Sequence, residues 1–179
     1  PVAQTKFLNL MAEQTNHMTE LVQNLLKLAR MQQDKPLQSE PVLVGELLTG
    51  LVNDFHLRAQ KAGKKIVLEK ENLPRLMAGR ADLYHIFQNL LDNALKYGQE
   101  DKPITIRAFL KDSSNHQENV GLTDKKEWIM VSVHNFGKAL TPEEQEKLFD
   151  RFYRVNSTQK VEGTGLGLSI AQQLVQKYD

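Results

Sequence analysis

With 179 residues, of which 40% are hydrophobic and 25% charged, the chain has the composition of one soluble globular domain or of a small domain with an appendage. Its formal net charge of +1 gives no strong attraction to nucleic acid or to an anionic membrane. The absence of cysteine excludes disulfides, thiolate metal sites and a cysteine nucleophile, and no apolar run reaches the roughly 20 residues of a membrane-spanning helix. Because the chain begins with Pro1 rather than Met, we interpret it as part of a longer protein.

The first segment predicts one long helix. Residues 3–32 contain no proline or glycine, and a seam of mostly apolar residues recurs at alternating steps of four and three. This heptad spacing predicts a coiled-coil-type helix that packs against partner helices, either in a dimer or in a hairpin whose other helix lies upstream. Burial against the chain's own globular domain is the alternative. The seam consists of Met11, Thr15, Met18, Val22, Leu25 and Ala29.

A polar stretch with two prolines follows, and its composition predicts a linker at residues 32–41, with a short strand at 37–42. Beyond it, an apolar pattern of helical period predicts a second helix at 44–61. Alternation then predicts a strand at 65–71 and, from fewer residues, another strand at 76–78.

A helix from Asp82 to Tyr97 sorts its side chains onto two faces. The apolar face consists of Leu83, Ile86, Phe87, Leu90, Leu91 and Ala94. The polar face consists of Asp82, His85, Asn89, Asp92, Asn93 and Lys96. Asparagine is a poor residue for a face that only meets solvent, because its side chain competes with the backbone for hydrogen bonds. The pair Asn89 and Asn93 beside Lys96 suits a hydrated divalent cation and the phosphates that it carries, and a solvated helix face is the simpler alternative.

The second half of the chain predicts two strands and a short helix. Residues 104–110 and 128–133 alternate as strands do, and the polar connection 112–127 is long for a hairpin, which indicates a mobile surface insertion. Thr141–Glu144 forms a capping box with proline at the first helical position, which predicts a helix that runs to about Phe149.

Two glycine-bearing turns are candidates for nucleotide contacts. Gly163, Gly165 and Gly167 precede an apolar helical pattern, so backbone amides and a helix N-terminus suit an anion there, although the spacing fits neither the P-loop nor the dinucleotide fingerprint. The other turn starts at Asn135, directly after a strand. An asparagine there can accept from an exocyclic amine and donate to a ring nitrogen, which matches the edge of adenine, and an ordinary Asx turn is the alternative.

The order of these features resembles the catalytic half of sensor histidine kinases, in the ATPase superfamily shared with gyrase, Hsp90 and MutL. Residues 89–97, 135–139, 149–154 and 163–167 are similar, in that order, to the family's asparagine box, first glycine box, phenylalanine box and second glycine box. The first helix resembles the second helix of the dimerisation and phosphotransfer hairpin. The resemblance implies an α+β fold, a two-layer α/β sandwich with a mixed sheet of Bergerat type, preceded by the coiled-coil-type helix.

The resemblance also implies a domain organisation and a set of site residues. The hairpin helix occupies 1–33, the linker 34–43 and the ATP-binding domain 44–179, with a mobile lid at 138–162. The implied ATP contacts are Asn89, Asn93, Lys96, Tyr97, Asn135, Gly137, Arg154, Gly163, Thr164, Gly165, Leu166 and Gly167. The implied catalytic residues are Asn93, Lys96 and Arg154, and the implied Mg²⁺ ligands are Asn89 and Asn93.

Three departures from the family pattern affect these expectations. The first glycine box usually begins with Asp and has Gly where this chain has Asn135 and Ala139, which predicts weaker ATP binding. The two strands that follow the last helix in the family are missing from 44–179. No histidine has the setting of the family's phosphoacceptor. The histidines are His17, His56, His85, His116 and His134.

The resemblance implies a fragment of a sensor histidine kinase that transfers the terminal phosphoryl of ATP to a histidine outside this chain, for relay to an aspartate of a response regulator. We expect a homodimer through the hairpin helices in the intact protein, a cytoplasmic location with a membrane anchor upstream as an open possibility, and no contact of this fragment with nucleic acid or membrane. A catalytically weak nucleotide-sensing module, acting through dimer geometry or phosphatase control, is the alternative. A mechanochemical ATPase of the same superfamily fits less well, because of the heptad helix and the Phe-Tyr-Arg segment.

Overall fold

The structure is a computed structural model that describes residues 39–112, 127–155 and 163–178, together with part of the first segment. In that segment the described residues are helical, and they are 4, 5, 7, 8, 11, 12, 14, 15, 18, 19, 21, 22 and 26. Most of the expected linker, the expected insertion between the last two strands and the segment 156–162 lie outside the described residues. The pairing of the heptad helix with partner helices stays a prediction.

The chain divides into two compact units. One, which we call the sheet unit, comprises residues 38–138. The other, which we call the terminal unit, comprises residues 1–37 and 139–179.

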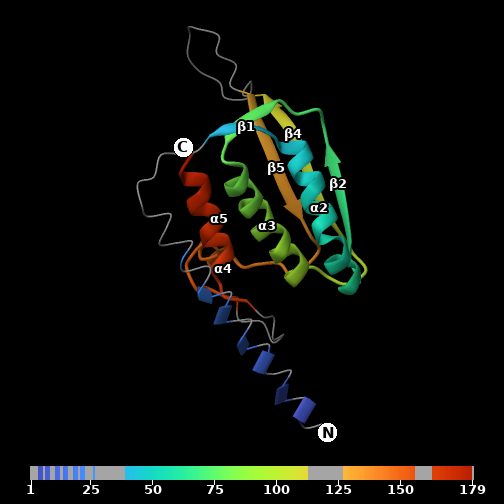
Figure 1. The fold of residues 1–179 in the computed structure, drawn as a ribbon, viewed down its shortest axis with the longest axis vertical. Coiled ribbons are helices and arrows are strands. Elements are labelled where there is room, and N and C mark those ends of the chain that lie inside the picture. The colour runs from blue at the N-terminus through green and yellow to red at the C-terminus, as the bar shows by residue number, and fades with distance from the viewer. Residues whose placement is uncertain are drawn as a thin grey trace. The chain divides into compact units, whose positions relative to one another are not determined.

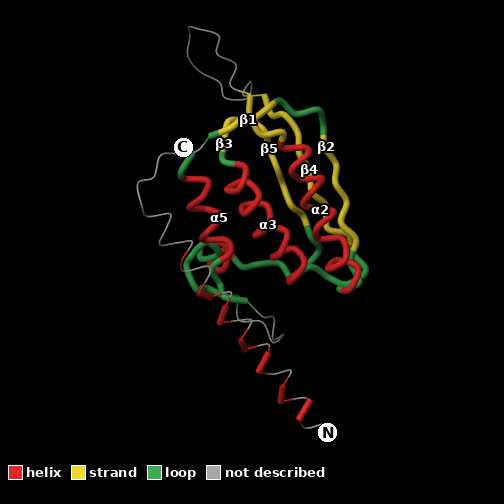
Figure 2. The backbone as a smooth tube through the Cα atoms, viewed as in Figure 1, coloured by secondary structure: helices red, strands yellow, loops and turns green. Residues whose placement is uncertain are grey.

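Five strands of the sheet unit form two sheets, drawn in yellow in Figure 2. Strand β2 (Lys65–Lys70) pairs in parallel with β4 (Pro103–Asp112), and β4 pairs antiparallel with β5 (Glu127–His134). The order β2-β4-β5 with both directions confirms the mixed sheet. A separate antiparallel pair joins β1 (Glu40–Leu43) to β3 (Arg75–Ala78), so the last residues of the expected linker belong to a sheet.

Helices α2 (Val44–Lys61) and α3 (Arg80–Tyr97) form the second layer over the mixed sheet (Figure 1). Along β4, Ile104, Ile106 and Ala108 are buried while Arg107 between them is exposed, because alternate side chains of a strand point to opposite faces. Both helices bury one apolar stripe, as their helical period predicts. The buried residues of α2 are Val44, Leu47, Leu48, Leu51, Phe55 and Ala59, and those of α3 are Leu83, Ile86, Phe87, Leu91, Ala94 and Leu95.

Electrostatic contacts join the layers at their ends. The Nζ of Lys70, at the end of β2, donates to the Gly45 carbonyl at 3.0 Å and to the Thr49 hydroxyl at 2.9 Å in the first turns of α2.

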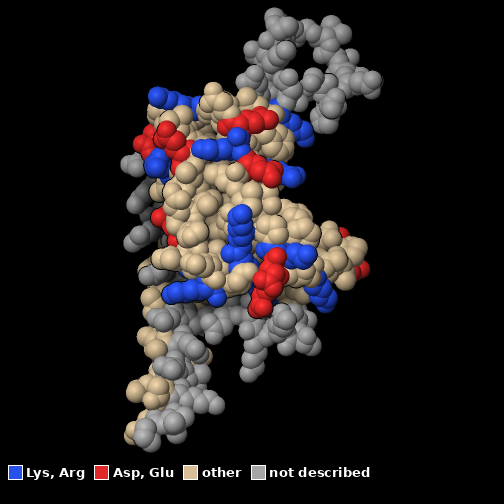
Figure 3. Space-filling view, turned by 90° about the vertical axis from the view of Figure 1, so that its right-hand side faces the viewer, with Lys and Arg blue, Asp and Glu red and all other residues tan. Residues whose placement is uncertain are grey.

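In Figure 3, Lys and Arg side chains lie beside Asp and Glu side chains, and neither sign of charge predominates on the face shown. This interspersion agrees with the net charge of +1.

The described helices of the terminal unit, besides the first segment, are α4 (Pro142–Glu146) and α5 (Gly167–Gln176). The capping box is confirmed, since the Thr141 hydroxyl accepts from the Glu144 amide at 3.2 Å and the Glu144 carboxylate accepts from the Thr141 amide at 2.9 Å. Helix α4 ends before the expected Phe149, because residues 147–149 continue as turns. Among the described helices, none has the length and hydropathy that crossing a membrane requires.

Candidate functional site

The polar face of α3 carries an open cluster of side chains. Asn89, Asn93 and Lys96 are each half-buried, and within the described part of the chain their side chains make no hydrogen bond or ion pair. The asparagines are four residues apart, so their amides project from neighbouring positions on one helix face, and Lys96 follows within one more turn. Two amides and one ammonium group are therefore available to a ligand.

Asp92, which the helical period placed on the same polar face, has a different role. Its carboxylate pairs with the Arg58 guanidinium of α2 at 2.5 Å, and that guanidinium also lies 4.6 Å from the ring centroid of Phe55. A second α2–α3 contact joins the Tyr84 hydroxyl, which donates to the Asp54 carboxylate at 3.1 Å. The edge of the polar face that carries Asp92 thus holds α3 against α2.

Burial raises the pKa of the Tyr84 hydroxyl, and the hydrogen bond to Asp54 and the charges of Asp54 and Asp92 raise it further. Each of these causes disfavours the phenolate: burial removes water from the charged form, and the carboxylates repel it. The neutral hydroxyl remains a donor to Asp54 over the neutral pH range, which keeps this contact between the helices intact.

The C-terminal end of α3 is held by two contacts. The Lys64 ammonium, from the turn after α2, donates to the Leu95 carbonyl, one of the last carbonyls of the helix, where a cation also complements the helix dipole. The Gly98 amide donates to the Ala94 carbonyl at 2.9 Å. A Cβ on Gly98 would lie 2.5 Å from that same carbonyl oxygen, so only glycine fits this position without displacement.

The turn that begins at Asn135 packs directly on this helix end. The Gln99 amide donates to the Phe136 carbonyl at 2.7 Å, and a Cβ on Gly137 would lie 2.8 Å from the Tyr97 carbonyl oxygen. The structure thus brings two of the segments that the sequence singled out, residues 89–97 and 135–137, to one end of the sheet unit.

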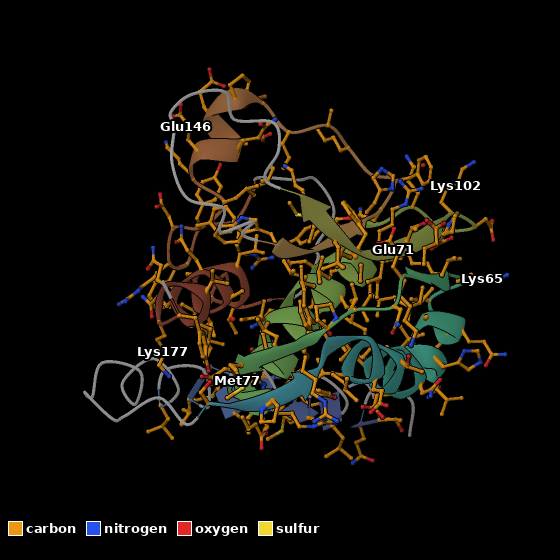
Figure 4. The ribbon with its side chains drawn as sticks, turned by 90° about the horizontal axis from the view of Figure 1, so that it is seen from above. Lys65, Glu71, Met77, Lys102, Glu146 and Lys177 are labelled. Atoms are coloured by element: carbon orange, nitrogen blue, oxygen red, sulfur yellow. The ribbon has the colours of Figure 1, made fainter. Side chains whose placement is uncertain are left out.

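Asn135 presents its amide beside the end of α3. The side chain is half-buried, its Cβ lies 3.5 Å from the position of a Cβ on Gly98, and its Nδ2 makes only a 3.5 Å contact with the carbonyl of the adjacent Phe136. Phe136 is 46% exposed, and its ring lies edge-on to that of His134, with 5.1 Å between the ring centroids. The Nζ of Lys102, which is labelled in Figure 4, lies 5.9 Å from the centroid of the Phe136 ring. Tyr97 is 44% exposed.

In the terminal unit, the segment similar to the phenylalanine box is bound to the second glycine turn. The Phe152 amide donates to the Gly165 carbonyl at 2.9 Å, and a Cβ on Gly165 would lie 2.8 Å from the Phe152 carbonyl carbon. Both residues have positive φ, +63° for Phe152 and +70° for Gly165. The left-handed conformation is costly for a phenylalanine, so the contact is built from two specialised backbone positions.

The rest of the glycine turn leads into α5. The Thr164 hydroxyl accepts from the Leu166 amide at 3.4 Å, and Leu166 is fully buried. The Ser169 hydroxyl donates to the Leu166 carbonyl at 2.9 Å, which ties the turn to the first turn of the helix. Gly163 and Gly167 are half-buried, and Arg154 is exposed.

The site residues expected from the sequence therefore form two groups. Those of the sheet unit, which the structure brings to one helix end, are Asn89, Asn93, Lys96, Tyr97, Asn135 and Gly137. Those of the terminal unit are Arg154, Gly163, Thr164, Gly165, Leu166 and Gly167, of which Gly165 contacts the segment before Arg154. Sequence reasoning missed Gly98, whose signal was only a glycine at a helix end.

The donor set on α3 is compatible with Mg²⁺. No cluster of three or more His, Cys, Asp or Glu residues that could hold a metal was found among the described residues. The amide oxygens of Asn89 and Asn93 are hard ligands, and Mg²⁺ commonly takes one or two protein ligands and completes its shell with water and phosphate oxygens. Two amides without a partner among the described residues fit that mode of binding and do not fit a metal held by protein ligands alone.

Comparison with known proteins finds relatives that match nearly the whole of this chain. The family model described as histidine kinase-, DNA gyrase B-, and HSP90-like ATPase matches residues 78–179. The chain is 32% identical to an uncharacterized sensor-like histidine kinase, ycf26, of Pyropia yezoensis, over 97% of this chain and 27% of that protein. It is 28% identical to the sensor histidine kinase WalK of Bacillus subtilis, again over 97% of this chain and 27% of that protein. The chain thus spans about a quarter of the length of these relatives.

Two solved structures share the fold. Full-length ShkA in complex with AMPPNP has a TM-score of 0.69 at 24% identity, over 92% of this chain and 32% of that chain. The histidine kinase ThkA in complex with the response regulator protein TrrA has a TM-score of 0.66 at 21% identity, over 91% of this chain and 42% of that chain. The likeness confirms the α/β architecture with a mixed sheet and helices.

Proposed function

Since the chain belongs to the family of histidine kinase-, DNA gyrase B- and HSP90-like ATPases, we propose that it is the ATP-binding catalytic part of a sensor histidine kinase. In the intact protein it transfers the terminal phosphoryl of ATP to a histidine that lies outside this chain. The two relatives named above carry the names sensor-like histidine kinase and sensor histidine kinase, and each aligns with 97% of this chain. This supports a histidine kinase over the gyrase-like and HSP90-like members of the family.

One observation carries the proposal. The amides of Asn89 and Asn93, which have no hydrogen bond among the described residues, lie on the helix whose end contacts the Asn135 turn, so that the proposed phosphate-binding and base-reading groups belong to one part of the sheet unit. A solvated helix face, the simpler alternative, accounts for asparagines that have no partner among the described residues, but it does not account for the close packing of the turn against Tyr97.

In the proposed site, Asn89 and Asn93 hold Mg²⁺ and Lys96 neutralises phosphate charge. When bound, Mg²⁺ would supply positive charge that stabilises the phosphates. Asn135 hydrogen-bonds the adenine edge, with Tyr97 against the base and Gly137 in close approach to the helix end. Within the terminal unit, the glycine turn of Gly163, Thr164, Gly165, Leu166 and Gly167 offers backbone amides that suit phosphate oxygens, and Arg154 offers a cation for a terminal phosphate.

The reaction forms a bond between an imidazole nitrogen of the acceptor and the terminal phosphorus, while the bond from that phosphorus to the bridging oxygen of ADP breaks. The chain's own contribution is positioning and charge neutralisation, which supply most of the catalysis in phosphoryl transfer. The phosphohistidine then passes its phosphoryl group to an aspartate of a response regulator. ThkA, whose fold this chain shares, is described in complex with such a regulator. Dimerisation through the first helix and a cytoplasmic location complete the proposal.

The test is a titration of a fluorescent ATP analogue into this chain and into the Asn93→Ala variant, each with and without Mg²⁺. We expect Mg²⁺-dependent binding that the substitution weakens at least about tenfold, corresponding to about 1.4 kcal/mol. Addition of a separate protein that carries a complete phosphoacceptor hairpin then yields phosphohistidine. Absence of nucleotide binding at millimolar concentration refutes the proposal. Binding without transfer to the hairpin favours the nucleotide-sensing module instead.

A further inference from the structure

Asn135 is a neutral amide at the position that reads the base, and this has a consequence for which bases the site accepts. An amide carries a donor, Nδ2, and an acceptor, Oδ1, on one planar group. We propose that the site binds 6-oxopurine nucleoside triphosphates, with hypoxanthine or guanine as the base, as well as ATP, and that Asn135 determines this broad specificity. The inference rests on the proposed function of the same site.

The chemistry of the two base edges supports the proposal. Adenine presents an amino group at position 6, which donates, and N1, which accepts. Hypoxanthine presents a carbonyl oxygen at position 6, which accepts, and an N1–H, which donates. An asparagine amide can pair with both atoms of either edge, because rotation of its terminal torsion by about 180° exchanges the donor with the acceptor.

Among the described residues, the surroundings of Asn135 impose little restriction on this rotation. Within the described residues its amide makes one hydrogen bond, from Nδ2 to the Phe136 carbonyl, which at 3.5 Å is at the outer limit for such a bond. A Cβ on Gly98 or on Gly137 would lie closest to a carbonyl oxygen of α3 and not to the Asn135 amide. A Cβ on Gly137 would nevertheless lie 3.3 Å from Nδ2 of Asn135. Glycine at 137 therefore leaves space beside the amide.

A carboxylate at this position would behave differently. Opposite position 6 a carboxylate oxygen only accepts and carries negative charge, so it attracts the 6-amino group of adenine and repels the 6-oxygen of hypoxanthine. Opposite position 1 the order is reversed, because the N1–H of hypoxanthine donates and N1 of adenine does not, so the preference for adenine arises from a carboxylate that faces position 6. Discrimination against the oxopurine thus requires a repulsive element, and the amide of Asn135 provides none. Sites built to pair a specific polar group reject the mismatched analogue strongly, because a buried group is then left unpaired.

The position of Asn135 is set by the backbone of its turn. The turn is fixed by the bond from the Gln99 amide to the Phe136 carbonyl at 2.7 Å and by the contact of Gly137 with Tyr97. Exchanging Asn135 for aspartate alters the charge and hydrogen-bonding pattern with almost no change of shape. The substitution is therefore a direct probe of base reading.

The experiment measures the dissociation constants of ATP and ITP, each with Mg²⁺, for this chain and for Asn135→Asp. ITP carries hypoxanthine and so differs from ATP only at positions 6 and 1. We expect the unchanged chain to bind the two nucleotides within about tenfold of one another, and Asn135→Asp to increase the preference for ATP by at least about tenfold. Ser132→Asp is the matched control, since it adds the same charge at an exposed position of β5, the strand that ends just before Asn135, and should leave the ratio unchanged.

A second variant protects the test against misfolding of Asn135→Asp. Asn135→Ala removes both hydrogen-bonding groups, so we expect weaker binding of both nucleotides with their ratio unchanged. The inference is overturned if the chain binds ATP but discriminates against ITP by more than about tenfold, or if Asn135→Asp leaves the ratio unchanged. If neither nucleotide binds, the proposed function itself fails, which is a distinct outcome.

Discussion

Phe152 and Gly165 are joined through their backbones: the Phe152 amide donates to the Gly165 carbonyl at 2.9 Å, and both residues have positive φ. This contact couples the segment that carries Arg154 to the glycine turn that begins α5. The two predicted phosphate-binding elements of the terminal unit are therefore one structural piece, and a change in either one reaches the other.

Replacement of Gly165 by alanine tests this coupling. The added Cβ lies 2.8 Å from the Phe152 carbonyl carbon, and φ of +70° costs a residue with a Cβ about 1–2 kcal/mol. We expect hydrogen exchange of the Phe152 amide to accelerate at least about tenfold and ATP affinity to fall by a similar factor.

Gly50→Ala is the control for that substitution, because a Cβ on Gly50 in α2 meets nothing within 4 Å. It should increase the free energy of unfolding by about 0.5–1 kcal/mol, through better helix propensity, and leave nucleotide binding unchanged. Unaltered exchange at Phe152 in the Gly165→Ala variant would show that the backbone bond does not hold the two segments together.

Adjacent residues on α3 have separable roles. Asp92→Asn removes the ion pair with Arg58 and should lower the free energy of unfolding by about 0.5–1 kcal/mol, since both side chains are partly exposed, while Mg²⁺-dependent ATP affinity stays constant. Asn93→Ala should do the reverse, with weaker binding and a stability change within about 0.5 kcal/mol. Denaturant unfolding and nucleotide titration of both variants provide the comparison. A loss of Mg²⁺-dependent binding in Asp92→Asn would place Asp92 in the metal site.

The Tyr84 hydroxyl predicts a stability loss at alkaline pH. Its pKa in the folded state is raised above 10.0 by burial and by Asp54 and Asp92. Below pH 10 the hydroxyl is protonated in the folded and the unfolded state, and its contribution to the free energy of unfolding is complete. Above pH 10 the unfolded chain loses the proton first, so the free energy of unfolding falls as pH rises. Unfolding free energies measured from pH 8 to 11 should therefore decline less steeply for Tyr84→Phe than for the unchanged chain. An equal slope in both proteins contradicts the assignment, and Tyr97→Phe serves as the exposed control.

The helical period of residues 82–97 predicted α3 and its apolar stripe well, because burial of one face follows directly from spacing. The helical period could not predict which side chains of other elements these residues contact. Asp92 fell on the same face as Asn93, yet it pairs with Arg58 from a helix 34 residues earlier, which no local pattern encodes. Leu95 is buried and Leu90 only half-buried, since the position of a packing partner shifts the stripe by part of a turn.

Backbone features at the candidate site were the least predictable. The sequence indicated strands near residues 37–42 and 76–78, but the antiparallel pairing of β1 with β3 depends on contacts between distant segments. The positive φ of Phe152 had no signal, because the left-handed region is rare for aromatic residues. The four motifs were found because they carry unusual residue types, whereas Gly98 acts only through the atom that it lacks.

Gly98→Ala tests how the end of α3 positions the turn that carries Asn135, the proposed adenine contact. The new Cβ would lie 2.5 Å from the Ala94 carbonyl oxygen, so residues 98 and 99 must move, and with them the bond from the Gln99 amide to the Phe136 carbonyl. Asn135 shifts relative to α3, whereas Asn89 and Asn93 do not. We expect ATP affinity to fall at least about tenfold and the affinity for magnesium tripolyphosphate, which has no base, to change less than about twofold. Gln99→Ala keeps the backbone bond and should leave both affinities unchanged. Equal losses for the two ligands in Gly98→Ala would mean that the glycine supports the helix as a whole and does not position the turn.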